Sequence, residues 1–530
     1  MSHRARLVAL LILLCISIPY LFAARLAGHE AVFGGFLLNP QDGNSYLAKM
    51  YQGWRGDDSF TLPYTAEPGQ GAHLFLFYLW LGKLARWVEI PLTLAYHLAR
   101  LIGSVAMLFA LQRFIAAYTP NAGWNDWCFA LAGLGLGLGW LLFPLGIIIS
   151  DFWIAEAYPF LSAYVNPHFA LGLALLLSLL TFGGAESKGL AVSFALSAAV
   201  GFALSILSPF GVILACLVMS GVLVWEWVRF FRAHGARTFR ELWQFLDAEK
   251  EVIPPPRQIL PRLGGVILGG APLLIYALWI ARVHPQLALW NAQNLTLTPA
   301  AWDVALGLSP ALLLAIPGVV WIVRQHQPRG MLPLIWTAMG LFLIYLPLGL
   351  QRRFMMGIYA PTVVLAAYGL QSLQPFLKQR APLVARLAFS LALPTTGLIL
   401  AMGIFGALAR DPFLYLSASE AKAMRWIETH TPQNALVLCA PDSGMFIPAQ
   451  TGRRVIYGHP FETVNAEQEK RLVMQFFQGE MLSPQSFLAD RRVDYIFYGP
   501  RERRLGEMPP FLHSKSVFSN SDVIIYQVEP

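Results

Sequence analysis

Long apolar runs dominate the first 415 residues of the chain, and short polar segments separate them. A run of about 20 apolar residues is long enough to cross the hydrocarbon core of a bilayer as a helix. The pattern therefore predicts a polytopic α-helical membrane domain over residues 1–415. The predicted 11 spans are 7–27, 92–112, 127–148, 168–183, 189–206, 209–229, 264–283, 304–323, 331–349, 355–374 and 386–408.

Basic residues between these runs predict the orientation, because cytoplasmic loops are rich in Lys and Arg. The segment 229–262 holds seven of them: Arg229, Arg232, Arg237, Arg240, Lys250, Arg257 and Arg262. Placing this segment inside also places the N-terminus inside and the C-terminus outside. We expect a protein of the plasma (inner) membrane with two large outer loops, 28–91 and 149–167.

The segment 72–90 is nearly apolar enough to be a further span, but it carries Lys83, Arg86 and Glu89. An additional crossing here would move the basic segment 229–262 to the outer face. We therefore expect residues 72–90 to form an amphipathic or re-entrant element on the outer membrane surface.

Composition agrees with this division. The chain has 530 residues, of which 56% are hydrophobic and 13% charged, and a mean hydropathy of +0.53. Soluble domains carry about 25% charged residues, so a soluble enzyme of this length is excluded. The excess of Lys and Arg lies in short loops between apolar runs, where it sets topology, so nucleic-acid binding is not indicated.

The last 115 residues have a different character, with 12 Lys and Arg and 13 Asp and Glu. The pattern predicts a helix over 417–430 with a Ser cap and a second helix over 465–479 that ends at Gly479. Apolar segments at 435–441, 493–500 and 522–528 predict strands. We expect residues 416–530 to form an extracytoplasmic α/β domain.

Acidic residues stand out in both outer loops because each loop places one directly where a span ends. Asp42 follows the first span within NPQDGNSYLAKMYQGWRGDD, and Asp151 and Glu156 follow the third within SDFWIAEAYPFLSAYVNPH. Acids so close to hydrocarbon are costly and indicate a functional site.

These residues resemble the GT-C glycosyltransferases, a superfamily that includes oligosaccharyltransferases, protein O-mannosyltransferases and lipid A aminoarabinose transferases. Asp42, with Tyr46 four residues later and the GxW-like QGWRGD, is similar to the first outer loop of that group. AYHLARL, with His97 and Arg100, is similar to its Ala-Ala-Arg-Leu region, and Asp151 and Glu156 match its second acidic loop. The tail segments MRWIETHTPQNALVL, PAQTGRRVIYGHPFET and VDYIFYGPRERRLG resemble the C-terminal domain of bacterial members.

The resemblance implies a sugar donor on a polyprenyl phosphate and an acceptor hydroxyl of a glycan, lipid or protein. Asp42 is the expected general base, with Asp151 and Glu156 as further catalytic candidates. Asp42, Asp151 and His168 are candidate ligands for Mg, Mn or Zn, although the first loop lacks a DxD pair. Arg352 and Arg353 are expected to bind the donor phosphate, since guanidinium groups pair with phosphate oxygens. The other candidate substrate-binding residues are Tyr46, Glu67, His73, Arg100 and Asn166.

Each candidate has a structural alternative. Asp42 is suited to cap the helix that follows it, Asp151 to cap a surface helix and His168 to cap a span. The arginine pair is suited to anchor lipid headgroups, and Arg100 needs an acidic partner whatever the function. The tail turns are candidates for contacts with acceptor glycan or for ordinary turns and surface charges; they contain Gly444, Gly452, Arg453, Arg454, His459, Glu462 and residues 499–503.

Two other classes of function stay open at this point. One is a transporter or flippase for lipid-linked glycans, for which inverted repeats would be expected and are not evident. The other is a membrane assembly protein without catalysis, which leaves the acidic loops unexplained. The four cysteines form no metal or disulfide pattern, and LAGLGLGLGW (131–140) predicts close helix packing by small residues.

Overall fold

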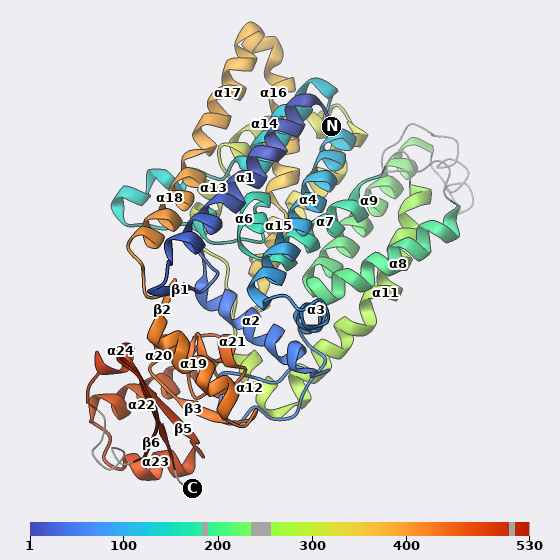
Figure 1. Cartoon of the computed structure of the whole chain (residues 1–530). Helices are drawn as coiled ribbons and strands as arrows, with labels where there is room; N and C mark the ends of the chain where they lie inside the picture. The colour runs from blue at the N-terminus through green and yellow to red at the C-terminus, as the bar shows by residue number, and fades with distance from the viewer. Residues whose placement is uncertain (183–188, 235–255, 508–514, 529–530) are drawn as a thin grey trace. The chain divides into compact units, whose positions relative to one another are not determined.

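The computed structural model describes residues 1–182, 189–234, 256–507 and 515–528 (Figure 1). Arg237, Arg240 and Lys250 of the predicted cytoplasmic segment lie outside the described residues. Contacts divide the chain into two compact units. Unit 1 comprises residues 1–17, 99–275 and 296–402, and unit 2 comprises 18–98, 276–295 and 403–530.

Unit 1 is built from helices. Its helices, including those shared with unit 2 at their ends, are α1 (His3–Leu26), α4 (Leu92–Tyr118), α5 (Asn125–Leu134), α6 (Pro159–Val165), α7 (Pro167–Leu180), α8 (Leu190–Leu207), α9 (Pro209–His234), α11 (Pro256–Val283), α13 (Ala301–Leu308), α14 (Ala311–Arg324), α15 (Pro328–Leu343), α16 (Tyr359–Leu377), α17 (Ala381–Ala392) and α18 (Pro394–Leu408). Short 3-10 turns include η4 (Ser150–Phe152) and η5 (Gln351–Met355).

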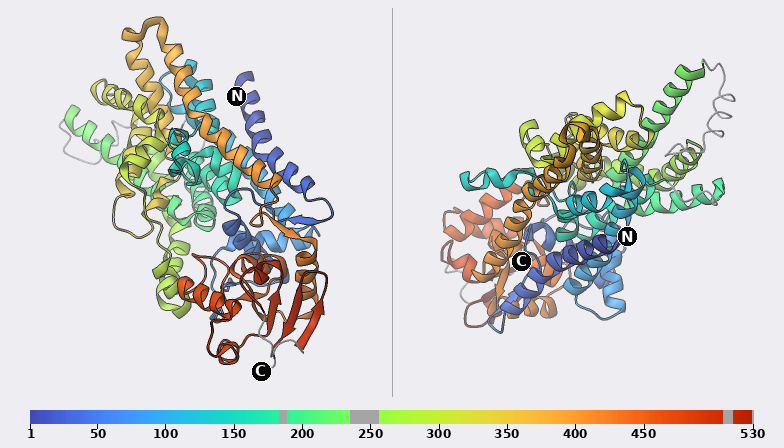
Figure 2. Two further views of the ribbon diagram at one scale, coloured as in Figure 1. Left: turned by 90° about the vertical axis from the view of Figure 1, so that its left-hand side faces the viewer. Right: turned by 90° about the horizontal axis from the view of Figure 1, so that it is seen from above.

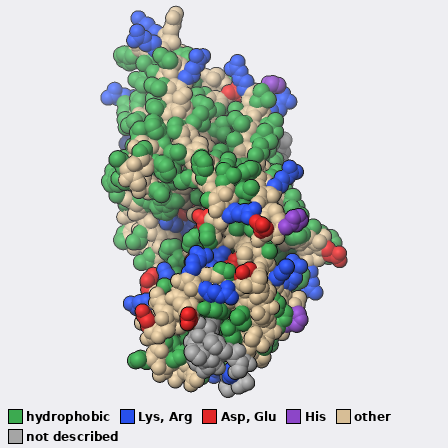
Figure 3. Space-filling view, turned by 60° about the vertical axis from the view of Figure 1, so that its left-hand side comes forward, with side chains coloured by type: hydrophobic (Ala, Val, Ile, Leu, Met, Phe, Trp, Pro, Cys, Tyr) green, Lys and Arg blue, Asp and Glu red, His purple; other side chains and the backbone are tan. Residues whose placement is uncertain are grey.

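Six helical stretches of the described residues are long and apolar enough to cross a membrane, and a bent pair would make a seventh. They are 3–26, 92–118, 190–207, 209–229, 259–283 and 359–408. The stretch 359–408 contains α16 and α17, which lie side by side as a hairpin (Figure 2). Hydrophobic side chains cover most of the visible face of these helices (Figure 3), and Leu268 and Ile102 remain 62% and 66% exposed. The count of 11 spans stays a prediction.

The predicted span 127–148 is wrong as one continuous helix. α5 ends at Leu134, and residues 135–149 contain only short 3-10 turns. The interpretation of LAGLGLGLGW as helix packing holds for Gly133, which lies in α5 against Ile12 of α1, whereas Gly135 and Gly137 lie beyond the end of α5. They are nevertheless tightly packed, since a Cβ on Gly137 would lie 2.0 Å from the Gly307 carbonyl oxygen. Gly is a poor helix former that allows this backbone contact.

Two further predicted spans differ from single helices of spanning length. The span 304–323 consists of α13 and α14, which meet at an angle of 88°. Ser309 and Pro310 separate the two helices, and proline supplies no N–H to continue a helix. The span 168–183 corresponds to the 14-residue α7. Residues 72–90 contain α3 (Leu76–Trp87), whose 12 residues reach only about 18 Å and cannot cross alone.

Unit 2 contains a five-stranded sheet with helices on both faces. Its elements are β1 (Ala31–Phe33), α2 (Pro40–Arg55), α3, α12 (Pro285–Gln293), β2 (Tyr415–Ser417), α19 (Ala418–His430), β3 (Leu436–Leu438), α20 (Pro441–Gly444), α21 (Ile447–Thr451), β4 (Arg454–Val455), α22 (Ala466–Gln478), α23 (Pro484–Asp490), β5 (Tyr495–Tyr498), α24 (Pro500–Arg503), β6 (Ser516–Ser519) and β7 (Ile524–Gln527). The strand order is β4-β3-β5-β7-β6, with β3 parallel to β4 and β5.

Alternation along the strands explains the layers of this sheet. Val437 and Phe497 share a buried cluster with Ile427 of α19, whereas Leu438 and Ile496 pack on the other face in a cluster that includes α22. Side chains of a strand point alternately to opposite faces, so both faces need a helical cover. The five elements predicted in the tail all have counterparts here, and Ser417 caps α19 in a capping box with Glu420. A separate domain over 416–530 stays a prediction.

Candidate functional site

Asp42 lies in the first turn of α2, and Asn39 occupies the N-cap position of that helix. The alternative that Asp42 merely caps the helix is therefore wrong. A carboxylate in the first turn interacts favourably with the helix dipole. The Asp42 side chain remains 46% exposed, whereas the neighbouring Gly43, Asn44 and Ser45 are buried. The carboxylate is thus accessible while its backbone is fixed.

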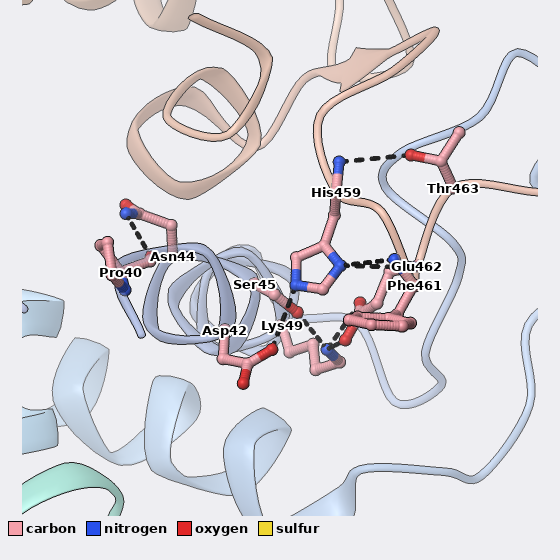
Figure 4. A network of polar contacts seen from close by, with 9 residues as sticks. All are labelled: Pro40, Asp42, Asn44, Ser45, Lys49, His459, Phe461, Glu462 and Thr463. Carbon is pink, nitrogen blue, oxygen red and sulfur yellow. Dashed lines mark hydrogen bonds and ion pairs between the residues drawn. The ribbon is translucent and has the colours of Figure 1, made fainter. Parts of the chain in front are cut away.

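His459, on the loop that follows β4, holds the Asp42 carboxylate (Figure 4). Its Nε2 lies 3.2 Å from Asp42 Oδ1. Its Nδ1 accepts hydrogen bonds from the backbone N–H groups of Phe461 and Glu462, at 3.1 and 3.2 Å. A ring nitrogen that accepts hydrogen bonds carries no proton, so the ring proton lies on Nε2 and is donated to Asp42.

A buried ion pair joins the same two segments. Lys49 of α2 has no exposed surface, and its Nζ lies 2.6 and 2.8 Å from the two carboxylate oxygens of Glu462. The Phe75 ring lies 4.4 Å from Nζ. Burial lowers the pKa of Lys49, and Glu462 opposes this shift. Burial alone would raise the pKa of Glu462, but the attraction of Lys49 and His459 outweighs it and the pKa lies below its ordinary value.

The other candidates of the first outer loop lie in different surroundings. Tyr46 stacks on Tyr78 with ring centroids 4.4 Å apart. Glu67 is exposed and lies 3.4 Å from the side-chain amide of Gln286. His73 is also exposed, and its backbone N–H donates to the Tyr276 hydroxyl. The proposed substrate roles of Tyr46, Glu67 and His73 stay hypotheses.

Asp151 is fully buried within unit 1, in η4 and outside the helices of spanning length. The Gly139 N–H donates to its Oδ2 at 3.0 Å, and a Cβ on residue 139 would lie 2.1 Å from Oδ1. Burial raises the pKa of Asp151 to about 7, although the hydrogen bond from Gly139 lowers it. The Ser150 N–H at the start of this turn donates to Asp303. Asp151 thus fixes the glycine-rich segment against η4.

Glu156 and the arginine pair, separate predictions, come together in unit 1. Arg353 Nη1 lies 3.2 Å from Glu156 Oε1, and Arg352 Nε lies 3.8 Å from the same oxygen. The Arg352 guanidinium also lies over the Trp153 ring at 4.8 Å. One carboxylate facing two guanidinium groups leaves one net positive charge. Such a cluster attracts an anion, as a phosphate-binding role requires.

The remaining candidates lie around α6 and α7. Arg100 is buried, and its Nη1 donates to the carbonyl oxygens of Ile16, Ala163 and Tyr164. These bonds connect three segments of unit 1, and an acidic partner for Arg100 stays a prediction. Asn166, also buried, is the N-cap residue of α7 without a side-chain capping bond. His168 lies in the first turn of α7, and Asn166 rather than His168 is its cap.

Comparisons with known proteins match the fold and not the sequence. No family model and no curated protein matches the chain. An oligosaccharyltransferase of Archaeoglobus fulgidus, solved with Zn and sulfate, matches with a TM-score of 0.52 at 14% identity. The match covers 92% of this chain and 68% of the oligosaccharyltransferase chain. The archaeal oligosaccharyltransferase AglB from the same organism, solved with an inhibitory peptide and a dolichol-phosphate, has a TM-score of 0.50 at 14% identity and covers 94% and 70%.

Two bacterial structures extend the comparison. Arabinofuranosyltransferase AftD from Mycobacteria has a TM-score of 0.53 at 13% identity, over 99% of this chain and 42% of its own. ArnT from Cupriavidus metallidurans has a TM-score of 0.50 at 10% identity, over 97% of both chains. All of these are GT-C glycosyltransferases. The chain has the GT-C fold. With its apolar helices of spanning length, it is an integral membrane protein.

A metal site is not evident among the described residues. No three His, Cys, Asp or Glu side chains among them gather in a group suited to a metal ion. Asp151 is fully buried and receives the Gly139 N–H, and Asp42 Oδ1 receives His459. Asp42 belongs to unit 2, whereas Asp151 and His168 belong to unit 1. The expected ligand set Asp42, Asp151 and His168 therefore stays a prediction, and one neighbour was solved with Zn.

His459 and Glu462, which the sequence presents as candidates for glycan contacts or as an ordinary turn and surface charge, contact Asp42 and Lys49. The strand β4 that precedes them is not among the predicted strands, so the position of this loop became evident only in the structure. Sites in α/β sheets lie outside the carboxyl ends of the parallel strands, and this loop follows that end of β4.

Proposed function

We propose that the protein is a glycosyltransferase that moves a sugar from a polyprenyl-phosphate-type lipid donor to an acceptor hydroxyl at the outer face of the membrane. The observation that supports this proposal most strongly is Asp42: an accessible carboxylate on a fixed helix, oriented by a histidine of defined tautomer. The GT-C fold supports it independently. The dolichol-phosphate bound to AglB is consistent with the proposed donor class.

In the proposed reaction, the acceptor oxygen attacks the anomeric carbon and forms the new glycosidic bond. The bond from that carbon to the phosphate oxygen breaks, and the polyprenyl phosphate leaves with the bonding electron pair. Asp42 takes the hydroxyl proton as general base, because an ionised carboxylate within hydrogen-bond reach of the hydroxyl makes the oxygen a better nucleophile.

The leaving phosphate gains negative charge as the bond breaks, and Arg352 and Arg353 are proposed to stabilise it. Glu156 is proposed to hold both guanidinium groups in place while one net positive charge remains. We propose that Asp151 supports the loop on which Glu156 lies. Its direct role in catalysis remains a hypothesis, and no step of this scheme depends on a metal.

The test is transfer by purified protein reconstituted in lipid, supplied with radiolabelled polyprenyl-phosphate sugars and with glycan, lipid and protein acceptors from cell envelopes. We expect labelled product with wild-type protein and a rate lower by a factor on the order of 10²–10⁴ with Asp42→Asn. The proposal is overturned if no donor gives transfer to any acceptor. If the lipid-linked sugar then also moves across the bilayer, the flippase hypothesis replaces it.

A further inference from the structure

We infer that His459 is a positioning residue for Asp42, so that the α/β sheet of unit 2 contributes directly to the reactive carboxylate. This inference rests on the proposed function for its catalytic consequence, but its structural part stands on geometry alone. Asp42 and His459 both belong to unit 2.

The imidazole ring of His459 cannot turn freely. Only 2% of the His459 side chain is exposed. The ring lies between two backbone N–H donors at Nδ1 and the Asp42 carboxylate at Nε2 (Figure 4). A flipped ring would lose these bonds in a buried place, where unmade hydrogen bonds are costly.

The loop that carries His459 is also fixed. The backbone N–H of His459 donates to the Thr463 hydroxyl at 3.3 Å, which closes the loop on itself. Glu462 of the same loop binds Lys49, which lies about two turns after Asp42 on the same face of α2. The side-chain amide of Gln293 from α12 donates to the Thr463 carbonyl oxygen. The donor that reaches Asp42 is therefore held by contacts from α2 and α12.

The Nε2–H group of His459 restricts the orientation of the Asp42 carboxylate. A carboxylate with nearly half of its surface exposed has several rotamers available, and the His459 N–H at 3.2 Å favours one of them. Fixing the base in one orientation removes an entropic cost from the reaction, and misplacing it by about 1 Å can cost about 100-fold in rate. His459 touches Asp42 and not the reacting atoms, so its role is positioning.

Two substitutions separate positioning from folding. His459→Leu removes the donor to Asp42, and we expect kcat to fall on the order of 10- to 100-fold with the KM for the lipid donor nearly unchanged. His459→Gln keeps an N–H donor at a similar reach, and we expect it to recover most of the lost kcat. The matched control is His430→Leu, because His430 is an exposed histidine of unit 2 that contacts Thr429 and Trp426.

A measurement without turnover tests the contact itself. Histidine-selective 15N labelling of the full-length protein in lipid nanodiscs gives the nitrogen shifts of its 11 histidines, and the His459→Gln spectrum identifies His459 by difference. We expect a protonated Nε2 and an unprotonated Nδ1, with an Nε2 shift that changes in Asp42→Asn. A His459 ring protonated at Nδ1, or an Nε2 chemical shift that is the same in the wild-type protein and in Asp42→Asn, overturns the inference.

The two experiments keep the inference and the proposed function distinguishable. If the wild-type protein transfers sugar and folded His459→Leu retains full kcat, the positioning role is wrong while the glycosyltransferase stands. If the 15N shifts agree but no transfer occurs with any donor, the contact stands and the proposed function fails, and the positioning role fails with it.

Discussion

Nε2 of His459 lies 3.2 Å from Oδ1 of Asp42, although 417 positions separate the two residues in the chain. A second contact of different chemistry, the buried pair of Lys49 and Glu462, joins the same helix to the same loop. The hydrogen bond from His459 to Asp42 is directional, because the tautomer places the proton on Nε2. The ion pair between Lys49 and Glu462 is a strong attraction that depends little on orientation. Together they fix the first outer loop to the carboxyl end of a parallel strand.

Replacing Asp42 by Asn tests the general base. Asn is nearly isosteric but does not accept a proton at neutral pH, so we expect turnover to fall by a factor on the order of 10²–10⁴. Donor binding and thermal unfolding should change little, because Asn39 and not Asp42 is the N-cap of α2. The control is Asp58→Asn in the same loop, at an exposed carboxylate paired with Lys83. Full turnover of Asp42→Asn would remove the base from the scheme.

Replacing Arg352 and Arg353 together by Gln tests the phosphate contact. Each lost charge-assisted hydrogen bond, at about 1.5–3 kcal/mol, should weaken donor binding about 10-fold or more. The double variant also leaves the buried Glu156 carboxylate without these partners, so Glu156→Gln is added in a third variant to restore folding. Arg410→Gln, at an exposed pair with Glu30, is the control. Unchanged donor affinity in the folded triple variant would assign the arginines to lipid headgroups.

Asp151 gives a prediction for pH. Its pKa is raised to about 7 by burial, so the folded protein holds a proton that the unfolded chain releases near pH 4. The folded state then binds more protons between about pH 4 and 7, and stability falls as pH rises across that window. We expect the unfolding temperature of the wild-type protein to drop between pH 5 and 8 more steeply than that of Asp151→Asn. Parallel curves would show that Asp151 is ionised throughout.

The Lys49 and Glu462 pair gives a prediction for stability. Removing one partner leaves a buried charge alone, which costs about 3–5 kcal/mol, so Lys49→Met should unfold at a much lower temperature. The double variant Lys49→Met with Glu462→Gln should recover much of that loss, since no unpaired charge remains. Lys83→Met is the control, because its partner Asp58 is exposed and little stability should be lost. Equal losses in the single and double variants would contradict the pairing.

The orientation is tested with two introduced cysteines. Ser521 and Gln379 are both exposed, the first before β7 and the second in the turn between α16 and α17. With the C-terminus outside, Ser521→Cys should react with an impermeant thiol reagent on intact cells, and Gln379→Cys only after permeabilisation. The wild-type protein is a suitable background because Cys439 is only 2% exposed. The reverse labelling pattern would invert the predicted topology.

Much of the architecture followed from sequence because it depends on local pattern. Apolar runs near 20 residues predicted α1, α4, α8, α9 and α11, since a helix that satisfies its own backbone is required in lipid. Short apolar segments predicted β3, β5 and β7, and the Ser417 cap predicted where α19 begins. The acids of both outer loops were also recognisable, because an acid at the edge of hydrocarbon is costly wherever it occurs.

Tertiary structure alone decided how these residues combine. Residues 135–149 do not continue α5, and Gly137 packs closely against the backbone of Gly307, a contact that hydropathy does not predict. Glu156 met Arg352 and Arg353 across nearly 200 positions, and His459 met Asp42 across 417. A local pattern carries no information on such pairs, because the free energy that selects them comes from burying and satisfying both partners at once. The sequence by itself determined which acids and arginines are candidates for the chemistry, and the fold determined which side chains lie against them.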